Sequence, residues 1–156
     1  MKKDELLLTS VRNLYNKMAW LNNSDMKDLF GNYTSAEVHC VEYIGNNEDS
    51  NVTKLAEVFL MTRGAISKMS KKLIKKGAIE YYQKPENKKE VYFRLTEQGK
   101  AIFELHKDLH NGFRERDKIV YDLITDEQYN TIIYLITEFD KHLDEEIKKK
   151  GLEIKS

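Results

Sequence analysis

Histidine is the residue type whose spacing in this sequence most suggests chemistry. The chain has four histidines, at positions 39, 106, 110 and 142. His106 and His110 are four residues apart, so on a helix they share one face, about one turn from each other. Two imidazoles placed in this way can bind one metal ion, and Zn²⁺ readily takes imidazole ligands. The same spacing also occurs in pairs that merely face solvent or the edge of a core, so the pair alone leaves both interpretations open.

Other reactive groups are sparse. The single cysteine, Cys40, excludes a disulfide within the chain and a CxxC metal knuckle. A lone cysteine on a helix is more often a small buried hydrophobe than an oxidation sensor, and both roles stay open here. The sequence contains no GxSxG, HExxH, P-loop or dinucleotide fingerprint. We therefore expect a protein that is not an enzyme.

The distribution of charge is more informative than its sum. The 156 residues carry 26 basic and 26 acidic side chains, and a net charge of zero argues at first against a nucleic-acid partner. Residues 62–94, however, hold 10 basic and 3 acidic side chains, a net charge of +7. The segments before and after them carry −3 and −4. A basic block of this kind is either a solvated face or a surface for an anionic polymer such as DNA.

The first two predicted elements are helices that would position His39. Apolar residues at steps of three and four predict a helix over about 4–28. The sequence Thr34-Ser-Ala-Glu37 is a capping box, in which both side chains satisfy free backbone N–H groups at a helix start. A second helix therefore follows, and it carries His39 and Cys40.

The basic block is predicted to contain two short helices, over 54–60 and 63–76, joined by a tight turn. An extended piece over 51–53 precedes them, and Thr62 is the N-cap of the second. Gly77 ends that helix, because glycine readily adopts the left-handed conformation found there. This layout is a helix-turn-helix.

A hairpin is predicted directly after the helix-turn-helix. Residues 79–84 and 90–95 alternate in polarity with the period of two that strands show, and the polar residues 85–89 form the tip between them. Small and polar residues at the start of the preceding helix let it lie deep in a major groove, while lysines contact phosphates and hairpin lysines reach an adjacent minor groove. The expected DNA contacts are Thr62, Arg63, Ser67, Lys68, Lys71, Lys72, Lys84, Lys88 and Lys89.

Two further helices complete the chain. Thr96 caps a helix that runs to about residue 123, and Thr125 with Gln128 forms a second capping box. The result is one mainly helical domain of the α+β class over residues 1–156. No apolar run approaches 18 residues, so we expect no membrane span. The N-terminus lacks the features of a signal peptide, and we expect a cytoplasmic protein.

From residue 34 to about 109 the sequence resembles the MarR family of winged-helix transcriptional regulators. The motifs that carry the resemblance are Asn-Val-Thr-Lys-Leu-Ala at 51–56, Thr-Arg-Gly-Ala-Ile-Ser-Lys at 62–68, Leu-Ile-Lys-Lys-Gly at 73–77 and the wing at 87–99. The wing departs from the family pattern, since Asn87 and Lys89 stand where Asp and Arg are usual. Lysine keeps the charge but lacks the planar fork of arginine, which favours phosphate contact over insertion into the minor groove.

The resemblance implies a homodimer that represses transcription from a palindromic operator. It assigns residues 34–95 to a DNA-binding winged-helix lobe, and residues 4–28 and 97–149 to helices of a dimerisation arm. The apolar stripes at both ends of the chain agree with an arm of this kind. A winged helix that serves as a protein-interaction module without DNA remains an alternative.

The histidines are also placed as in the zinc-responsive branch of this family. In that branch one histidine lies in the second helix, shortly after the threonine that begins it, and two more lie ten and fourteen residues after the threonine of the Leu-Thr that ends the wing. Here these positions are His39, His106 and His110, so the resemblance implies a transition-metal site, with Zn²⁺ as the expected cofactor. The fourth ligand is open between Asp25, Glu42 and water. Metal that favours the DNA-fitting arrangement would tighten DNA binding by linkage.

An effector without metal is the main alternative. Much of the family binds small phenolic or lipophilic ligands near the same junction and is then released from DNA. Four aromatic residues, Tyr15, Trp20, Phe30 and Tyr33, are the expected lining of such a pocket, although packing in the core is the simpler role for them.

Overall fold

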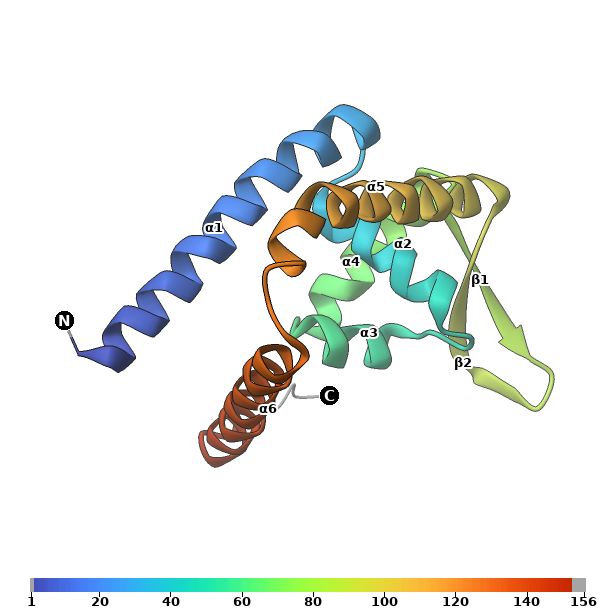
Figure 1. The fold of residues 1–156 in the computed structure, drawn as a ribbon. Coiled ribbons are helices and arrows are strands. Elements are labelled where there is room, and N and C mark those ends of the chain that lie inside the picture. The colour runs from blue at the N-terminus through green and yellow to red at the C-terminus, as the bar shows by residue number, and fades with distance from the viewer. Residues whose placement is uncertain (1, 153–156) are drawn as a thin grey trace.

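A computed structural model describes residues 2–152 of the chain. In this region six helices and one two-stranded antiparallel sheet follow each other in the predicted order (Figure 1). Their bounds are α1 Lys3–Phe30, α2 Ser35–Asn46, α3 Val52–Phe59, α4 Arg63–Lys75, β1 Ile79–Lys84, β2 Asn87–Leu95, α5 Glu97–Tyr121 and α6 Asp126–Lys149. The expected α+β class with a winged helix-turn-helix is confirmed. None of the helices in the described region is long and apolar enough to cross a membrane.

Side-chain caps determine where most of these helices begin. The Thr34 hydroxyl accepts the Glu37 N–H at 3.2 Å, and the Glu37 carboxylate accepts the Thr34 N–H at 2.9 Å. Thr125 and Gln128 form the same reciprocal pair at the start of α6. Each bond satisfies a backbone N–H that has no partner within the helix. Single caps of this kind begin α3, α4 and α5, at Asn51, Thr62 and Thr96.

The hairpin differs from its predicted form at the tip. Strand β2 begins at Asn87 instead of residue 90, and Asn87 pairs with Lys84. Only residues 85–86 remain in the turn, because an irregularity in the β1 pairing brings the strands together earlier. Lys88 and Lys89 consequently lie on a strand close to the tip and not in a flexible loop.

The extended piece expected over residues 51–53 is reduced to a bridge at Ser50, and residues 52 and 53 are helical instead. The residue that forms an isolated antiparallel bridge is Ser50, whose carbonyl oxygen accepts the Phe93 N–H at 2.8 Å. The Asn51 side chain accepts the Lys54 N–H at 2.9 Å, which commits Val52 to the first turn of α3. This bridge attaches the wing to the connection between α2 and α3.

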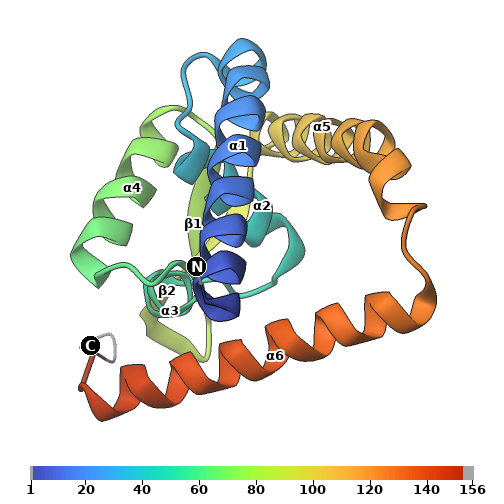
Figure 2. The same cartoon turned by 60° about the vertical axis from the view of Figure 1, so that its left-hand side comes forward.

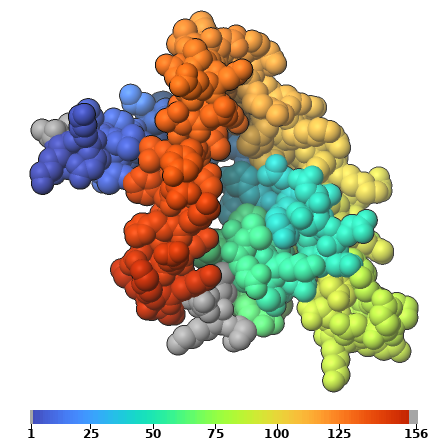
Figure 3. All heavy atoms as spheres, turned by 60° about the horizontal axis from the view of Figure 1, so that its bottom comes forward, coloured from blue at the N-terminus to red at the C-terminus, as the bar shows by residue number. Residues whose placement is uncertain are grey.

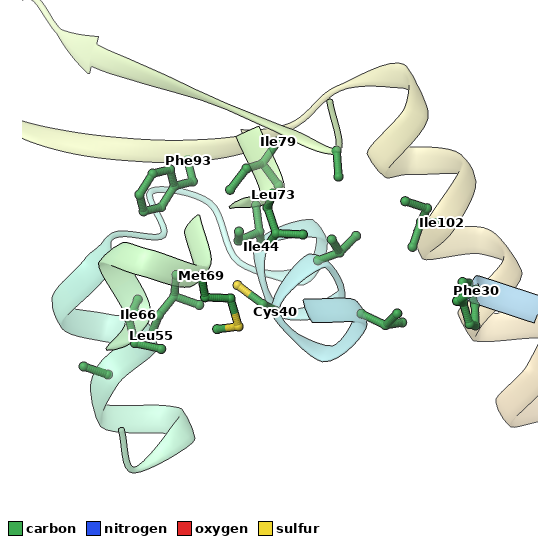
Figure 4. Close-up of a cluster of buried hydrophobic side chains, with 14 of the residues drawn as sticks. Phe30, Cys40, Ile44, Leu55, Ile66, Met69, Leu73, Ile79, Phe93 and Ile102 are labelled. Carbon is green, nitrogen blue, oxygen red and sulfur yellow. The ribbon is translucent and has the colours of Figure 1, made fainter. Parts of the chain in front are cut away.

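The hydrophobic core lies between α2, the helix-turn-helix and the sheet (Figure 4). Helix α2 is central, since Val38, Cys40 and Val41 are fully buried. Against it pack the inward faces of the other elements. These buried residues are Leu55, Ala56, Ile66, Met69, Leu73, Ala78, Ile79, Phe93 and Ile102. The core therefore fixes the lobe that carries α4 and the wing.

Helices α1 and α6 contribute little to this core. Only Met26 and Phe30 of α1 are buried, and no residue of α6 is. Figure 1 shows α1 extending away from the lobe, Figure 2 shows α6 running below it, and in Figure 3 the two helices form separate ridges of the surface. Helices are stabilised mainly by packing of an apolar face. Both present apolar faces that residues 2–152 of a single chain leave exposed.

Candidate nucleic-acid interface and histidine cluster

The helix-turn-helix exposes one polar and basic face of α4. Helix α3 ends at Leu60, which has a left-handed conformation with φ 50°, and Thr62 then caps α4 by accepting the Ala65 N–H at 3.2 Å. The opposite face of α4 is anchored in the core by Ile66 and Leu73, which are fully buried. The expected contacts Thr62, Arg63, Lys68, Lys71 and Lys72 are all exposed, and Ser67 is half-buried.

The wing presents fewer unpaired charges than the sequence suggested. Lys88 and Lys89 are exposed, as expected. Lys84 is instead held by the loop after α2, where its ammonium lies 2.5 Å from a carboxylate oxygen of Asp49. Hydrogen bonds from Lys84 and then Tyr82 hold the pKa of Asp49 below its ordinary value. The geometry thus gives Lys84 a partner within the protein, and the sequence offered no signal for it beyond an acidic loop.

The three histidines singled out from the sequence come together between α2 and α5. One ring nitrogen from each of His39, His106 and His110 lies within 4.8 Å of the other two. The Nε2 atoms of His106 and His110 are 3.0 Å apart. His39 and His106 are in edge contact, with ring centroids 5.3 Å apart. The predicted convergence of these side chains is therefore present in the fold.

His106 is the buried member of this cluster, with 1% of its surface exposed. Burial, followed by the neighbouring His110 and His39, lowers the pKa of His106 to about 4. Burial also lowers the pKa of His39, although Glu42 offsets part of this effect. The Nδ1 atom of His106 is buried without a hydrogen-bond partner. Neutral imidazoles with an unpartnered nitrogen are what a transition metal requires, so the donor set fits such an ion.

The two carboxylates considered as a fourth ligand differ in position. An oxygen of Glu42 lies 3.6 Å from Nδ1 of His106, at the edge of the cluster. Asp25 lies close enough to Arg116 to interact with it electrostatically. Of the two, Glu42 is the one that has a contact with a histidine of the cluster among the described residues.

The aromatic residues expected around an effector pocket divide into two groups. Phe30 and Tyr33 line a pocket of about 470 Å³ between the end of α1 and the first turns of α5. Tyr15 and Trp20 lie elsewhere on α1, with 71% and 81% of their surfaces exposed. Within the described residues Tyr15 and Trp20 therefore neither line this pocket nor pack in the core, and both predicted roles are wrong for them. The reason is that α1 extends away from the lobe (Figure 1).

Cys40 is fully buried in the core. Burial, together with the nearby Glu37 charge, raises the pKa of its thiol to about 12. The reactive thiolate is therefore almost absent at neutral pH. This environment is that of a small buried hydrophobe and is unfavourable for an oxidation sensor.

An N-capped helix with an exposed basic face, followed directly by a hairpin wing, defines a winged helix-turn-helix protein of the DNA-binding class. Residues 33–91 match the MarR family. The chain is 30% identical over 141 residues to the transcriptional regulator PchR of Bacillus subtilis (strain 168), across 88% of this chain and 79% of PchR. The chain belongs to the MarR family of transcriptional regulators, which are not enzymes.

Two further similarities agree with this assignment. The chain is 40% identical over 95 residues to the uncharacterised regulator YhjH of the same Bacillus strain. That match covers 61% of this chain, and the chain spans only about half, 54%, of the length of YhjH. The fold matches Streptococcus pneumoniae FabT, solved in complex with DNA, with a TM-score of 0.80 and 19% identity over 92% of this chain and 99% of FabT.

Proposed function

We propose that the protein is a homodimeric transcriptional repressor that binds a palindromic operator through α4 and the wing. The observation that carries this proposal is the exposed basic face of α4, held outward by the buried Ile66 and Leu73. Its N-terminal residues Thr62, Arg63 and Ser67 are suited to base edges, and the free N–H groups there to a phosphate. FabT, whose fold is similar, was solved with DNA, which supports the same use of this fold.

The lysines of the interface serve mainly for phosphate contact. Lys68, Lys71 and Lys72 follow the N-terminal turn of α4, and Lys88 and Lys89 extend from the wing. Each phosphate that such a side chain neutralises releases condensed counterions, so affinity falls steeply with salt. Lys84 contributes less, because Asp49 already holds its ammonium.

A second copy of the chain is the partner that the arm helices require. Apolar residues of α1 and α6 line a shared groove of about 350 Å³: Leu7, Leu8, Val11, Leu135, Ile136, Phe139 and Leu143. A solitary chain would leave this apolar surface in water. Two copies related by a twofold axis would cover it and place their two α4 helices in successive major grooves.

A transition metal held by His39, His106 and His110 is the proposed effector. These side chains come from α2 and α5, so a bound ion would link the helix at the centre of the lobe to the arm. Glu42 or water would supply a fourth ligand. Zn²⁺ is the ion that we propose, although Ni²⁺, Co²⁺ and Cu²⁺ also accept imidazole ligands. Metal that favours the DNA-fitting arrangement tightens operator binding by reciprocity.

A small lipophilic or phenolic ligand is the second candidate for the effector. The pocket beside Phe30 and Tyr33 favours it, since its volume of about 470 Å³ suits a small molecule and its lining is mainly apolar. Release from DNA on ligand binding, unchanged by chelator, would support this candidate over the metal.

The DNA-binding proposal is tested with a duplex enriched by the protein from a randomised pool. We expect the double variant Lys68→Ala/Lys88→Ala to bind it more weakly. In a dimer the variant loses two phosphate contacts from each protomer, and each lost contact removes about 0.9 from the salt slope, so the slope should fall by about 4. The matched control is Lys107→Ala/Lys141→Ala, which removes two exposed lysines from α5 and α6. Unchanged binding of the first variant at moderate salt would overturn the proposed interface.

The metal proposal is tested by calorimetry on chelator-treated protein. We expect about one Zn²⁺ per protomer, as the described residues bring three imidazoles together at one place. The affinity should fall in acid as the imidazoles become protonated, and for His106, whose pKa burial lowers to about 4, this requires a pH well below 6.5. The variant His106→Ala/His110→Ala should lose both the binding and the effect of Zn²⁺ on operator affinity. His142→Ala is the control, because His142 is an exposed histidine on α6. Weak binding that these variants leave unchanged would remove the metal proposal.

A further inference from the structure

An ion pair between a buried carboxylate and a half-buried lysine joins the end of the recognition helix α4 to the start of α2. The Nζ atom of Lys76, the residue that caps α4, lies 2.6 Å from a carboxylate oxygen of Glu37. The same ammonium donates to the backbone carbonyl of Asn32 at 2.5 Å. Glu37 is 3% exposed. These contacts link residues that are 39 and 44 positions apart in the sequence.

Glu37 has two partners that together keep it charged. Besides binding Lys76, its carboxylate accepts the Thr34 N–H of the α2 capping box. Burial alone would raise the pKa of Glu37, but hydrogen bonds from Lys76 and Thr34 hold it below its ordinary value. A buried carboxylate that loses its partner is strongly destabilised, so this pair has little freedom to open.

One aromatic side chain, Tyr33, and one amide side chain, Gln98, lie beside the ion pair and connect it to α5. The Lys76 ammonium lies 4.8 Å from the ring centroid of Tyr33. Gln98, in the first turn of α5, donates from one Nε2 atom to the Tyr33 hydroxyl at 2.7 Å and to the Lys76 carbonyl at 3.0 Å. The end of α4 is thus held from the α1–α2 turn, from α2 and from α5.

The backbone at this end of α4 is equally constrained. Gly77 ends the helix with φ 79°, and its carbonyl accepts the Thr96 hydroxyl at 2.6 Å. At Gly99 the backbone of α5 approaches so closely that a Cβ would lie 2.0 Å from the Ala78 carbonyl oxygen. The other end of α4 follows the exposed Leu60 and has no comparable ties in the described residues. Apolar packing of Ile66 and Leu73 anchors α4 in the core, and the polar contacts that hold its direction relative to α2 and α5 are concentrated at its C-terminal end.

We propose that Glu37 and Lys76 are positioning residues that set the direction of α4 relative to α2, and thereby the operator spacing that the dimer prefers. The Lys76 ammonium is occupied by Glu37 and Asn32, so it orients the helix and does not bind a phosphate. In a twofold dimer a change in this direction moves the two recognition helices relative to each other, and their separation must match one turn of DNA. This inference rests on the proposed operator binding as a dimer.

The test compares single and double variants of the pair with a matched control. Glu37→Gln removes the charge but keeps the capping box, which accepts Gln at that position. Lys76→Met removes the partner, and Lys76→Arg retains a cation that can reach both acceptors. Lys75→Met is the control, because it removes the same charge from the same turn, where Lys75 is exposed and forms no ion pair with any residue that the structure describes. Thermal unfolding establishes that each variant is folded.

The readout is the ratio of affinities for the selected operator and for operators with one base pair added or removed between the half-sites. We expect Glu37→Gln and Lys76→Met to lower this ratio by about tenfold, within the range of coupling seen for residues of one hydrogen-bond network. The salt slope should stay that of the wild type, since no phosphate contact is lost. Lys76→Arg should restore most of the ratio, and Lys75→Met should leave it unchanged.

The combined variant Glu37→Gln/Lys76→Met separates positioning from stability. It leaves no unpaired buried charge, so it should regain stability relative to Lys76→Met while its spacing ratio stays low. If the pair variants weaken binding to every operator equally, or if Lys75→Met lowers the ratio as much, the inference is overturned. Failure of the wild type to select any operator would instead refute the proposed function, from which this inference follows.

Discussion

Acid should destabilise the metal-free protein through His106, and the structure sets the size of this effect. Burial lowers the pKa of His106 to about 4, against about 6.5 in an unfolded chain. Between these values only the unfolded state takes up the proton, so stability is retained above pH 6.5 and falls as pH drops toward 4. A shift of this size corresponds to about 3 kcal/mol in total, of which about 2 kcal/mol is lost between pH 7 and pH 5.

Urea unfolding at pH 7, 6 and 5 in the presence of chelator measures this loss. We compare wild type with His106→Gln, which places a neutral side chain in the buried position. Between pH 7 and pH 5 the free energy of unfolding should fall by about 2 kcal/mol less in the variant than in the wild type, because the variant lacks His106. The carboxylates titrate in both proteins, so their contribution cancels in this comparison. His142→Gln is the control, since His142 is exposed on α6 and should change nothing. An equal acid loss in wild type and His106→Gln would refute the assigned burial of a neutral His106.

Three further perturbations test the packing of the fold. Gly99→Ala should lower the free energy of unfolding by more than about 2 kcal/mol in urea, because the added Cβ would meet the Ala78 carbonyl; Gly112→Ala, in open space on the same helix, should raise it slightly. Cys40 should resist alkylation at pH 8 until denaturant is added, since burial raises its pKa to about 12; modification of the native protein at the rate of a free thiol would contradict this. Phe139→Asp should convert the proposed dimer to monomers in analytical ultracentrifugation, and a dimer that persists would place the interface elsewhere.

The sequence predicted the element order because its local signals agree with one another. Thr34, Thr62, Thr96 and Thr125 mark helix starts in the sequence, and each is an observed N-cap. The error at the hairpin tip has a physical cause: a run of polar residues is compatible with a loop or an exposed strand, and only cross-strand pairing decides between them. Strand β2 pairs from Asn87 onward, which periodicity alone does not reveal.

The sites were predictable to different degrees. The spacing of His106 and His110 was visible in the sequence, but only the packing of α2 on α5 brings His39 to them. The partners of Lys84 and Lys76 were invisible, since Asp49 and Glu37 are 35 and 39 residues away. Long-range pairs of this kind depend on tertiary packing and not on any local pattern. A lysine that is counted as a DNA contact from its charge can therefore be committed to a carboxylate of its own chain.

Selection of duplexes from a randomised pool by the wild-type protein tests the central claim most directly. If α4 and the wing of a twofold dimer bind an operator, the enriched sequences should share a palindrome whose half-site centres lie about 10 base pairs apart, or a multiple of that spacing. The enrichment should also be weaker with Lys68→Ala/Lys88→Ala, since phosphate contacts are lost. A pool without a common sequence, or one enriched only in single half-sites, would contradict the account.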